Sequence, residues 1–127
     1  MEMDLEVDLG QEGLNMIFFD YEVLMLRHAW NVAIGSVHLS TAELWKHVCR
    51  VLKESGGTRK SISRASVINS ANRFHKNGIW EYYEATGKGG YHKLFQPIMT
   101  EEELLETIKT IIVDRLNLEL EKIRGHS

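Results

Sequence analysis

The middle of the chain carries cationic and hydrogen-bonding side chains at a spacing that favours binding to a polyanion. Positions 66, 69, 70 and 73 follow the period of a helix, which places their side chains on one side of it. Arginine offers a planar pair of donors that fits guanine or phosphate, and asparagine can pair with the edge of adenine. Hydroxyl groups and backbone amides near a helix start can donate to phosphate. The candidate DNA contacts in this segment are Ser63, Arg64, Ser66, Asn69 and Arg73.

Chemistry assigns different roles to these residues. We expect Arg64 and Asn69 to read base edges and Arg73 to contact a phosphate. The alternative, that all three are merely exposed polar side chains, stays open. Ser61 or Ser63 could cap the helix N-terminus as well as donate to phosphate.

Charge is unevenly distributed along the chain, whose net charge is −3. Residues 1–22 contain seven acidic residues and no Lys or Arg, whereas residues 50–93 contain nine basic residues against three acidic ones. Binding to nucleic acid depends on local neutralisation of phosphates, so the overall acidity does not exclude it. Arg59 and Lys60 are secondary phosphate candidates within the basic segment, with a solvated loop as the alternative.

A second cationic group lies at a glycine-rich turn. Residues 87–90 place Lys88 among three glycines. No strand leads through this turn into a helix and no Ser or Thr follows the lysine, so the phosphate loop of nucleotide-binding proteins is not predicted. Taken as the tip of a hairpin, the segment predicts that Lys88, Tyr91 and Lys93 contact the nucleic acid beside the helix.

Other chemistry has no support in the sequence. The six histidines are not spaced as a ligand set, and His47 and Cys49 would point to different sides of a helix. One cysteine builds neither a disulfide nor a thiolate zinc site, so Cys49 is expected to be a small core residue. No Ser-His-Asp or Cys-His arrangement is present in the pattern. We therefore expect a protein that is not an enzyme, without a metal site or cofactor.

The elements that position these groups are three helices, a hairpin and a last helix. Apolar residues predict a first helix from Leu14 to about residues 31–35, followed by one short strand near residues 36–39. Ser40 or Thr41 is expected to cap the second helix. The third helix is expected to end at Asn77 and Gly78, with a stripe of buried residues. That stripe is Val67, Ile68, Ala71, Phe74 and His75.

The rest of the chain predicts a hairpin and a long helix. Residues 79–96 read as two strands around the glycine-rich turn. Thr100 and Glu103 have the spacing of a capping box before a helix with a broad apolar band. The sequence thus predicts a mainly α fold with a small β-hairpin (α+β), a winged helix-turn-helix with a long C-terminal dimerisation helix. Its expected parts are a flexible acidic arm (1–13), a winged-helix DNA-binding domain (14–97) and the C-terminal helix (98–127).

Several segments resemble the winged-helix transcriptional regulators of the penicillinase-repressor type and their archaeal relatives. The resemblance spans about residues 20–123 and is carried by ISRASVINSANRFHKNGIW at 62–80, TGKGGYH at 86–92 and EVLMLRHAW at 22–30. It implies a homodimeric DNA-binding regulator, usually a repressor, whose C-terminal helix contributes to dimerisation. The acidic arm and the long loop at 55–60 depart from repressors that a sensor protease cleaves, so that mode of induction is not carried over.

The last helix has more apolar surface than a small core should need. Burying that surface against a second copy is the expectation, with packing inside one chain as the alternative. The candidate dimerisation residues are Leu105, Ile108, Ile112, Leu116 and Leu120. A two-fold dimer would place two recognition helices about 34 Å apart and predicts a pseudo-palindromic operator.

Together these observations predict a sequence-specific regulator that binds a double-stranded DNA operator as a homodimer. No apolar stretch is long enough to cross a bilayer and the first residues are acidic, so we expect a cytoplasmic protein without a membrane partner. The alternative function is a winged-helix module that contacts another protein. The sequence predicts neither a small-molecule effector nor a role for the acidic arm.

Overall fold

Helices and one small sheet alternate along the chain in the predicted order. The computed structural model describes residues 3, 5–32, 38–87 and 90–125, and of Gly90 and Tyr91 it describes the backbone only. The first element is a short 3-10 turn, η1 (Gly13–Met16). The first three α-helices that follow it lie close together around the core. The elements are α1 (Asp20–Val32), β1 (Leu39–Ser40), α2 (Thr41–Glu54), α3 (Arg64–Lys76), β2 (Trp80–Gly87), β3 (Gly90–Pro97) and α4 (Glu101–Arg124).

Three helices begin at hydroxyl caps that the sequence predicts. The side chains of Ser40, Ser63 and Thr100 each accept a hydrogen bond from the backbone amide three residues further on. At α4 the side chain of Glu103 also accepts from the amide of Thr100, which completes the predicted capping box. These bonds satisfy amides that have no partner inside the helix and fix where each helix starts.

The predicted start of the first helix is wrong. Leu14, Ile17 and Phe18 have helical spacing, but Leu14 belongs to η1 and α1 begins only at Asp20. Gly13, the first residue of η1, has a φ of 58° and turns the chain there. The amide of Phe19 then donates to the Glu22 carboxylate over 3.0 Å and starts α1 there. The apolar stripe is real, but a turn and a helix share it.

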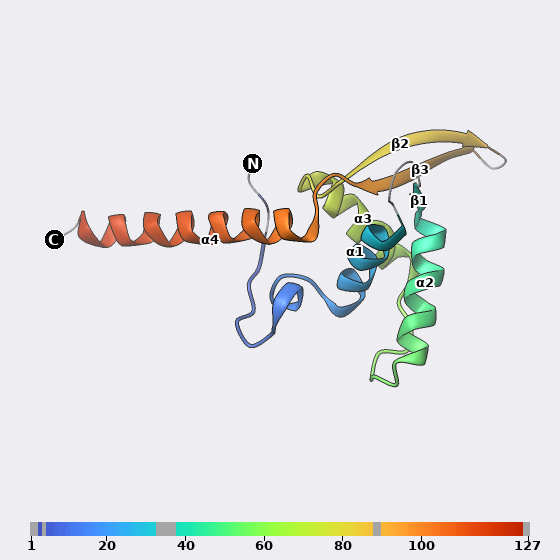
Figure 1. Cartoon of the computed structure of the whole chain (residues 1–127), viewed down its shortest axis with the longest axis horizontal. Helices are drawn as coiled ribbons and strands as arrows, with labels where there is room; N and C mark the ends of the chain where they lie inside the picture. Colours follow the sequence, from blue (N-terminus) through green and yellow to red (C-terminus); the bar gives the residue numbers. More distant parts are fainter. Residues whose placement is uncertain (1–2, 4, 33–37, 88–89, 126–127) are drawn as a thin grey trace.

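The sheet has three antiparallel strands in the order β1, β3, β2. Strands β2 and β3 form the predicted hairpin, in register from Trp80 opposite Pro97 to Gly87 opposite Gly90. The short β1 pairs with β3 through Leu39 opposite Phe95. The hairpin extends well past the helices, as the yellow and orange strands of Figure 1 show.

The core lies where the three helices meet the base of the hairpin. Phe74 of α3 packs edge-on against Trp80 of β2, with ring centroids 4.9 Å apart, and also against Phe18, with ring centroids 5.7 Å apart. Gly78 has a φ of 75° and turns the chain directly from α3 into β2. Because α3 and the hairpin share these aromatic contacts, the position of one fixes the position of the other.

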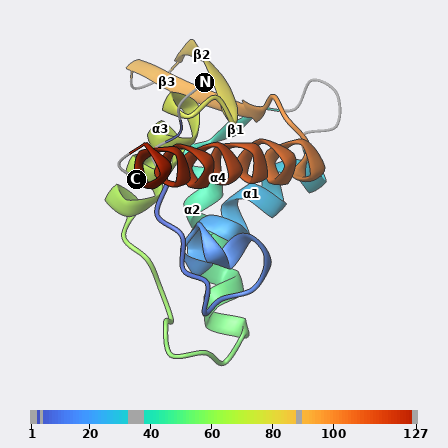
Figure 2. The same ribbon diagram turned by 90° about the vertical axis from the view of Figure 1, so that its left-hand side faces the viewer.

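Helix α4 divides into a packed half and a free half. Leu104 and Ile108 are buried in the core, whereas every residue from Val113 to Arg124 is exposed. The indole of Trp30 in α1 donates to the carbonyl of Met99 over 2.9 Å and holds the start of α4 against α1. The rest of the helix projects away from the core, on the side opposite the hairpin (Figure 1), and Figure 2 views the molecule from the side toward which it projects.

The acidic arm lies against the core, although the sequence suggests a loose segment. Met3 is buried, Leu5 packs on the core, and the amide of Asp8 donates to the carbonyl of Met16 over 2.7 Å.

No helix in the described residues is long and apolar enough to cross a membrane. The α+β class and the winged helix-turn-helix order are confirmed.

Candidate nucleic-acid interface

The start of α3 is held in place by α2. The indole of Trp45 donates to the carbonyl of Ile62 over 2.8 Å, and the thiol of Cys49 contacts the same oxygen at 3.5 Å. Ser63 then caps α3, and its hydroxyl lies 2.8 Å from that of Ser66. Cys49 is half-buried, and its contact adds to the anchoring of α3. These contacts with α2 hold the N-terminal end of α3 in place.

The outward face of α3 differs from the polar stripe predicted from sequence. Ile68 and His75 belong to the predicted buried side, yet both are exposed. Ser70 belongs to the predicted polar side, yet it is buried. We call the exposed positions of α3 the outward face. These are Arg64, Ala65, Ile68, Asn69, Asn72, His75 and Lys76.

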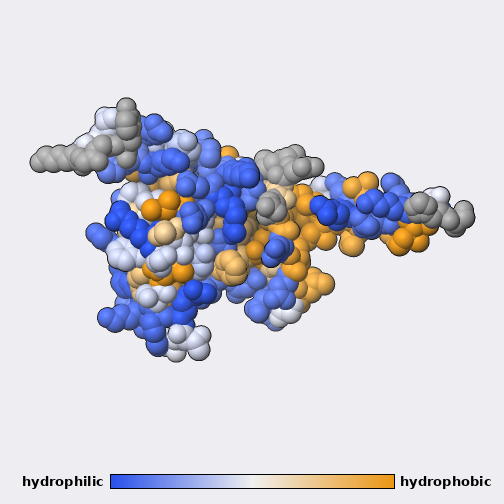
Figure 3. Space-filling view, turned by 180° about the vertical axis from the view of Figure 1, so that it is seen from behind, coloured by the Kyte–Doolittle hydropathy of each residue, from blue (hydrophilic) through white to orange (hydrophobic). Residues whose placement is uncertain are grey.

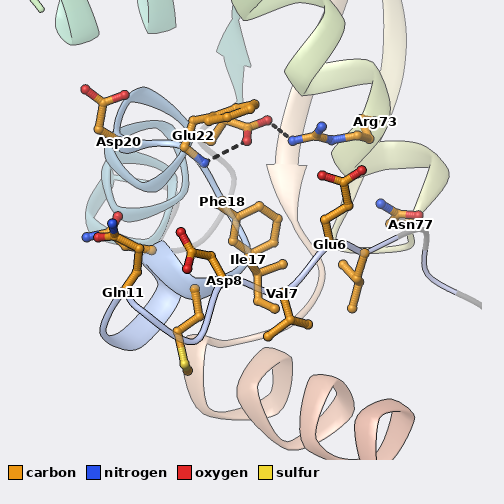
Figure 4. Close-up of a pocket in the computed structure, with 14 residues that line it drawn as sticks. Glu6, Val7, Asp8, Gln11, Ile17, Phe18, Asp20, Glu22, Arg73 and Asn77 are labelled. Atoms are coloured by element: carbon orange, nitrogen blue, oxygen red, sulfur yellow. Dashed lines mark hydrogen bonds and ion pairs between the residues drawn. The ribbon is translucent and has the colours of Figure 1, made fainter. Parts of the chain in front are cut away.

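The rotation of α3 follows from one buried carboxylate in α1. Glu22 is only 1% exposed, and its carboxylate accepts hydrogen bonds from Ser70 over 2.8 Å and from Arg73. Figure 4 shows Glu22 between its own helix and the guanidinium of Arg73. A buried carboxylate needs such donors, because water cannot replace them. Ser70 and Arg73 are consequently turned toward α1, away from the centre of the outward face.

Arg73 thus has a partner within the protein, which the sequence does not predict. Its side chain is 42% exposed but is ion-paired with Glu22. We assign Arg73 to the support of α3 and do not count it among the nucleic-acid contacts proposed below. Arg59 is similarly engaged, because its Nε lies 3.1 Å from Asp20 and its guanidinium stacks over Tyr21. Lys60 is exposed in the same loop.

Arg64 and Asn69, the two residues predicted to read base edges, are both exposed on the outward face. Among the described residues, no carboxylate forms an ion pair with Arg64. Ser63 and Ser66 lie at the N-terminal end of α3, where their hydroxyl groups form a hydrogen bond with each other. Asn72 and Lys76 were not predicted from the sequence, although both continue the four-residue spacing that starts at Arg64.

The hairpin closes one side of this face. Lys93 of β3 donates to the side chain of Asn72 over 3.3 Å and lies 4.7 Å above the ring of Tyr82. A hollow of about 540 Å³ lies between α3, the start of α2 and the hairpin, lined among others by Arg64, Ile68 and His92. No acidic residue is among its described lining residues. Lys88 and the side chain of Tyr91 lie outside the described residues.

A second hollow, of about 650 Å³, has the opposite charge. It lies between the acidic arm and α1, and Glu6, Asp8 and Asp20 are among its lining residues. Figure 4 shows the arm running past Phe18 at the floor of this hollow, with Glu6 on the side of Arg73 and Asn77. Arg73 of the basic segment also lines this hollow and pairs there with Glu22, so the acidic and basic segments of the sequence meet at this point.

His28 of α1 and His47 of α2 stack, with ring centroids 3.7 Å apart. Burial lowers the pKa of His28 below its ordinary value of 6.5, and the Arg50 cation lowers this pKa further, against the opposite effect of Glu43. The pKa of His47 is also lowered, first by burial and then by His28 and Arg50. The described residues contain no cluster of three or more metal-ligating side chains.

The five predicted dimerisation residues do not all lie on one free surface. Leu105, Leu116 and Leu120 are exposed, Ile112 is half-buried, and Ile108 is buried in the core of its own chain. Exposed apolar side chains continue toward the C-terminus as Val113, Leu116, Leu120 and Ile123, at intervals of three and four residues. Orange atoms in Figure 3 mark apolar residues on the projecting helix and at its root.

Comparison with known proteins finds a likeness to a solved structure. No family model matches the chain, and no curated protein matches it. The fold is similar to a solved structure described as "Possible transcriptional regulator from Methanosarcina mazei Go1", with a TM-score of 0.59 and 18% sequence identity. The match covers 87% of this chain and 81% of the other. This likeness shows a shared fold, and the narrower resemblance to the penicillinase-repressor type stays a prediction.

Proposed function

We propose that this protein is a transcriptional regulator that binds double-stranded DNA with α3 in the major groove. The observation that carries the proposal is the outward face of α3, where Arg64, Asn69, Asn72 and Lys76 are exposed together. A major groove is wide enough to admit an α-helix, and its base edges offer partners for Arg and Asn side chains. Lysines at the rim suit phosphate oxygens.

The hairpin extends the same contact. Lys93 lies next to Asn72, so a duplex seated on α3 would bring its backbone to the hairpin. The tip with Lys88 and Tyr91 would follow that backbone further. The description of the similar structure from Methanosarcina mazei as a possible transcriptional regulator agrees with this proposal. Such a regulator would act in the cytoplasm.

A homodimer formed through α4 completes the proposal. The exposed stripe from Val113 to Ile123 would be buried by the same stripe of a second copy. Two copies would present two outward faces to one duplex and would favour a pseudo-palindromic operator. Occupying such an operator blocks access to the DNA, so repression is the outcome we propose.

A mobility-shift assay with a random duplex pool tests this function. We expect the chain to retain a subset of sequences at low salt and to lose affinity steeply as salt rises, since phosphate binding releases counterions. Arg64→Ala should relax sequence preference at one position. Lys76→Ala should weaken all duplexes alike and reduce the salt slope by about 1.

The matched control is Lys122→Ala, which removes a cation on the distal half of α4, where Lys122 pairs with Glu119. This variant should bind duplexes as the wild-type chain does. If the folded protein retains no duplex at low salt, DNA binding is refuted and the outward face becomes a protein-contact surface.

A further inference from the structure

We propose that Ile68 recognises the 5-methyl group of thymine, so that each operator half-site contains a thymine opposite this residue. The inference deepens the proposed function and depends on it. It rests on where the structure places one side chain, because the sequence pattern assigns Ile68 to the core.

Ile68 is an apolar side chain in the middle of a polar row. It is 37% exposed and lies between Arg64 and Asn72, each one helical turn away on the outward face. All three residues line the hollow between α3 and the hairpin. Ala65 is exposed beside them. Any duplex that reaches Arg64 and Asn72 therefore also meets the Ile68 side chain.

The major groove offers Ile68 one well-suited partner. Guanine, adenine and cytosine present donors and acceptors there, whereas thymine adds an apolar methyl group. An isoleucine pressed against a donor or acceptor would displace water without replacing its hydrogen bond, which is unfavourable. Contact with the thymine methyl group instead buries apolar surface on both sides.

The neighbouring side chains limit where this thymine lies. Arg64 suits guanine, and Asn69 and Asn72 suit adenine. Four residues of helix span about 6 Å, which is nearly two base-pair steps of about 3.4 Å. We therefore expect the thymine within about two base pairs of the guanine that Arg64 contacts.

Replacing thymine by deoxyuridine tests the inference, because it removes only the methyl group. A duplex selected from a random pool is first identified, and its thymines are then replaced one at a time. Fluorescence anisotropy should show about fourfold weaker binding at one position per half-site, as expected for one buried methyl group. Ile68→Ala should bind the thymine and deoxyuridine duplexes equally.

Two controls separate this role from a general effect on folding. Leu9→Ala truncates another exposed apolar residue, in the acidic arm, and should keep the wild-type preference for thymine. Thermal unfolding should show Ile68→Ala folded, since the side chain is outside the core.

The possible results distinguish this inference from the proposed function. If a selected duplex binds but no single methyl removal weakens it, Ile68 does not read thymine, while DNA binding stands. The same conclusion follows if Ile68→Ala still prefers thymine over deoxyuridine, or if the pool yields no preferred sequence. If no duplex binds at all, the proposed function fails and this inference fails with it.

Discussion

The ion pair between Glu22 and Arg73 determines which residues of α3 face outward. Glu22 is buried, and Ser70 and Arg73 supply its hydrogen bonds from α3. Without these donors the carboxylate would have to be hydrated or protonated, and either change would disturb the packing of α1 on α3. One acidic residue in the first helix thus fixes the rotation of the third.

Removing the partner of this carboxylate should destabilise the fold. We expect Arg73→Ala to lower the free energy of unfolding by about 3 kcal/mol, the low end for a broken buried pair, because Arg73 is partly exposed. Urea denaturation followed by circular dichroism measures this change. Arg59→Ala breaks the exposed pair with Asp20 and should change the free energy by less than about 1 kcal/mol.

A different outcome would restore the role that the sequence predicts for Arg73. If Arg73→Ala keeps the wild-type stability but loses affinity for every duplex, Arg73 is a phosphate contact and its pairing with Glu22 contributes little.

The stacked histidines predict a pH dependence of stability. The pKa values of His28 and His47 are lowered in the folded chain by burial, so the unfolded chain binds more protons near pH 6.5. The free energy of unfolding should therefore have its full value above pH 6.5 and should decrease as the pH falls below that value. Urea midpoints between pH 5 and pH 8 measure the slope.

His47→Gln should flatten this slope, because it removes one of the two rings and the repulsion between them. His92→Gln, an exposed histidine on the hairpin, is the matched control and should keep the wild-type slope. A midpoint that does not change below pH 6.5 would contradict the prediction.

At the scale of elements, α4 combines two functions in one helix. Its first turns complete the core through Leu104 and Ile108, and its last turns display apolar residues to solvent. Within the distal half, Leu116 and Leu120 lie on one stripe, whereas Leu118 points to another side of the helix. This arrangement provides a matched pair of substitutions on neighbouring positions.

We expect Leu116→Asp to convert a dimer into a folded monomer. Leu116 is 59% exposed in the single chain, so a charge there costs the monomer little but opposes burial in a dimer. Light scattering coupled to size exclusion gives the mass, and circular dichroism confirms the fold. Leu118→Asp should leave the dimer intact. A wild-type chain that is monomeric at every concentration would exclude the dimer.

Local signals explain why most elements could be predicted from the sequence. Ser40, Ser63 and Thr100 cap their helices through bonds that span three residues, so the information lies within one turn. The hairpin follows from its turn residues in the same way. The start of α1 was mispredicted because helical spacing of apolar residues also occurs in the turn that precedes it.

At the scale of the whole molecule, the acidic arm and the outward face of α3 present opposite charges. The acidic arm covers the side of α1, while Arg64 and Lys76 are exposed on the outward face. A polyanion would be repelled from one side and attracted to the other. The average composition hides this arrangement, whereas the segment charges suggest it.

The site was only partly predictable because its geometry depends on distant contacts. The exposure of Arg64 and Asn69 on α3 could be predicted from residue type and helical spacing. The exposure of Ile68 and the engagement of Arg73 could not, because both depend on Glu22, which lies 51 residues before Arg73. Local periodicity cannot determine the rotation of a helix when its anchor belongs to another element.

The separation between the anchor of α3 and its exposed side chains has a practical consequence. Ser70 and Arg73 attach α3 to Glu22 of α1. The side chains of Arg64, Ile68 and Asn72 take no part in that attachment. These three positions can be randomised in a combinatorial library while the scaffold stays constant. Variants retargeted to new DNA sequences could then be selected without redesigning the rest of the molecule.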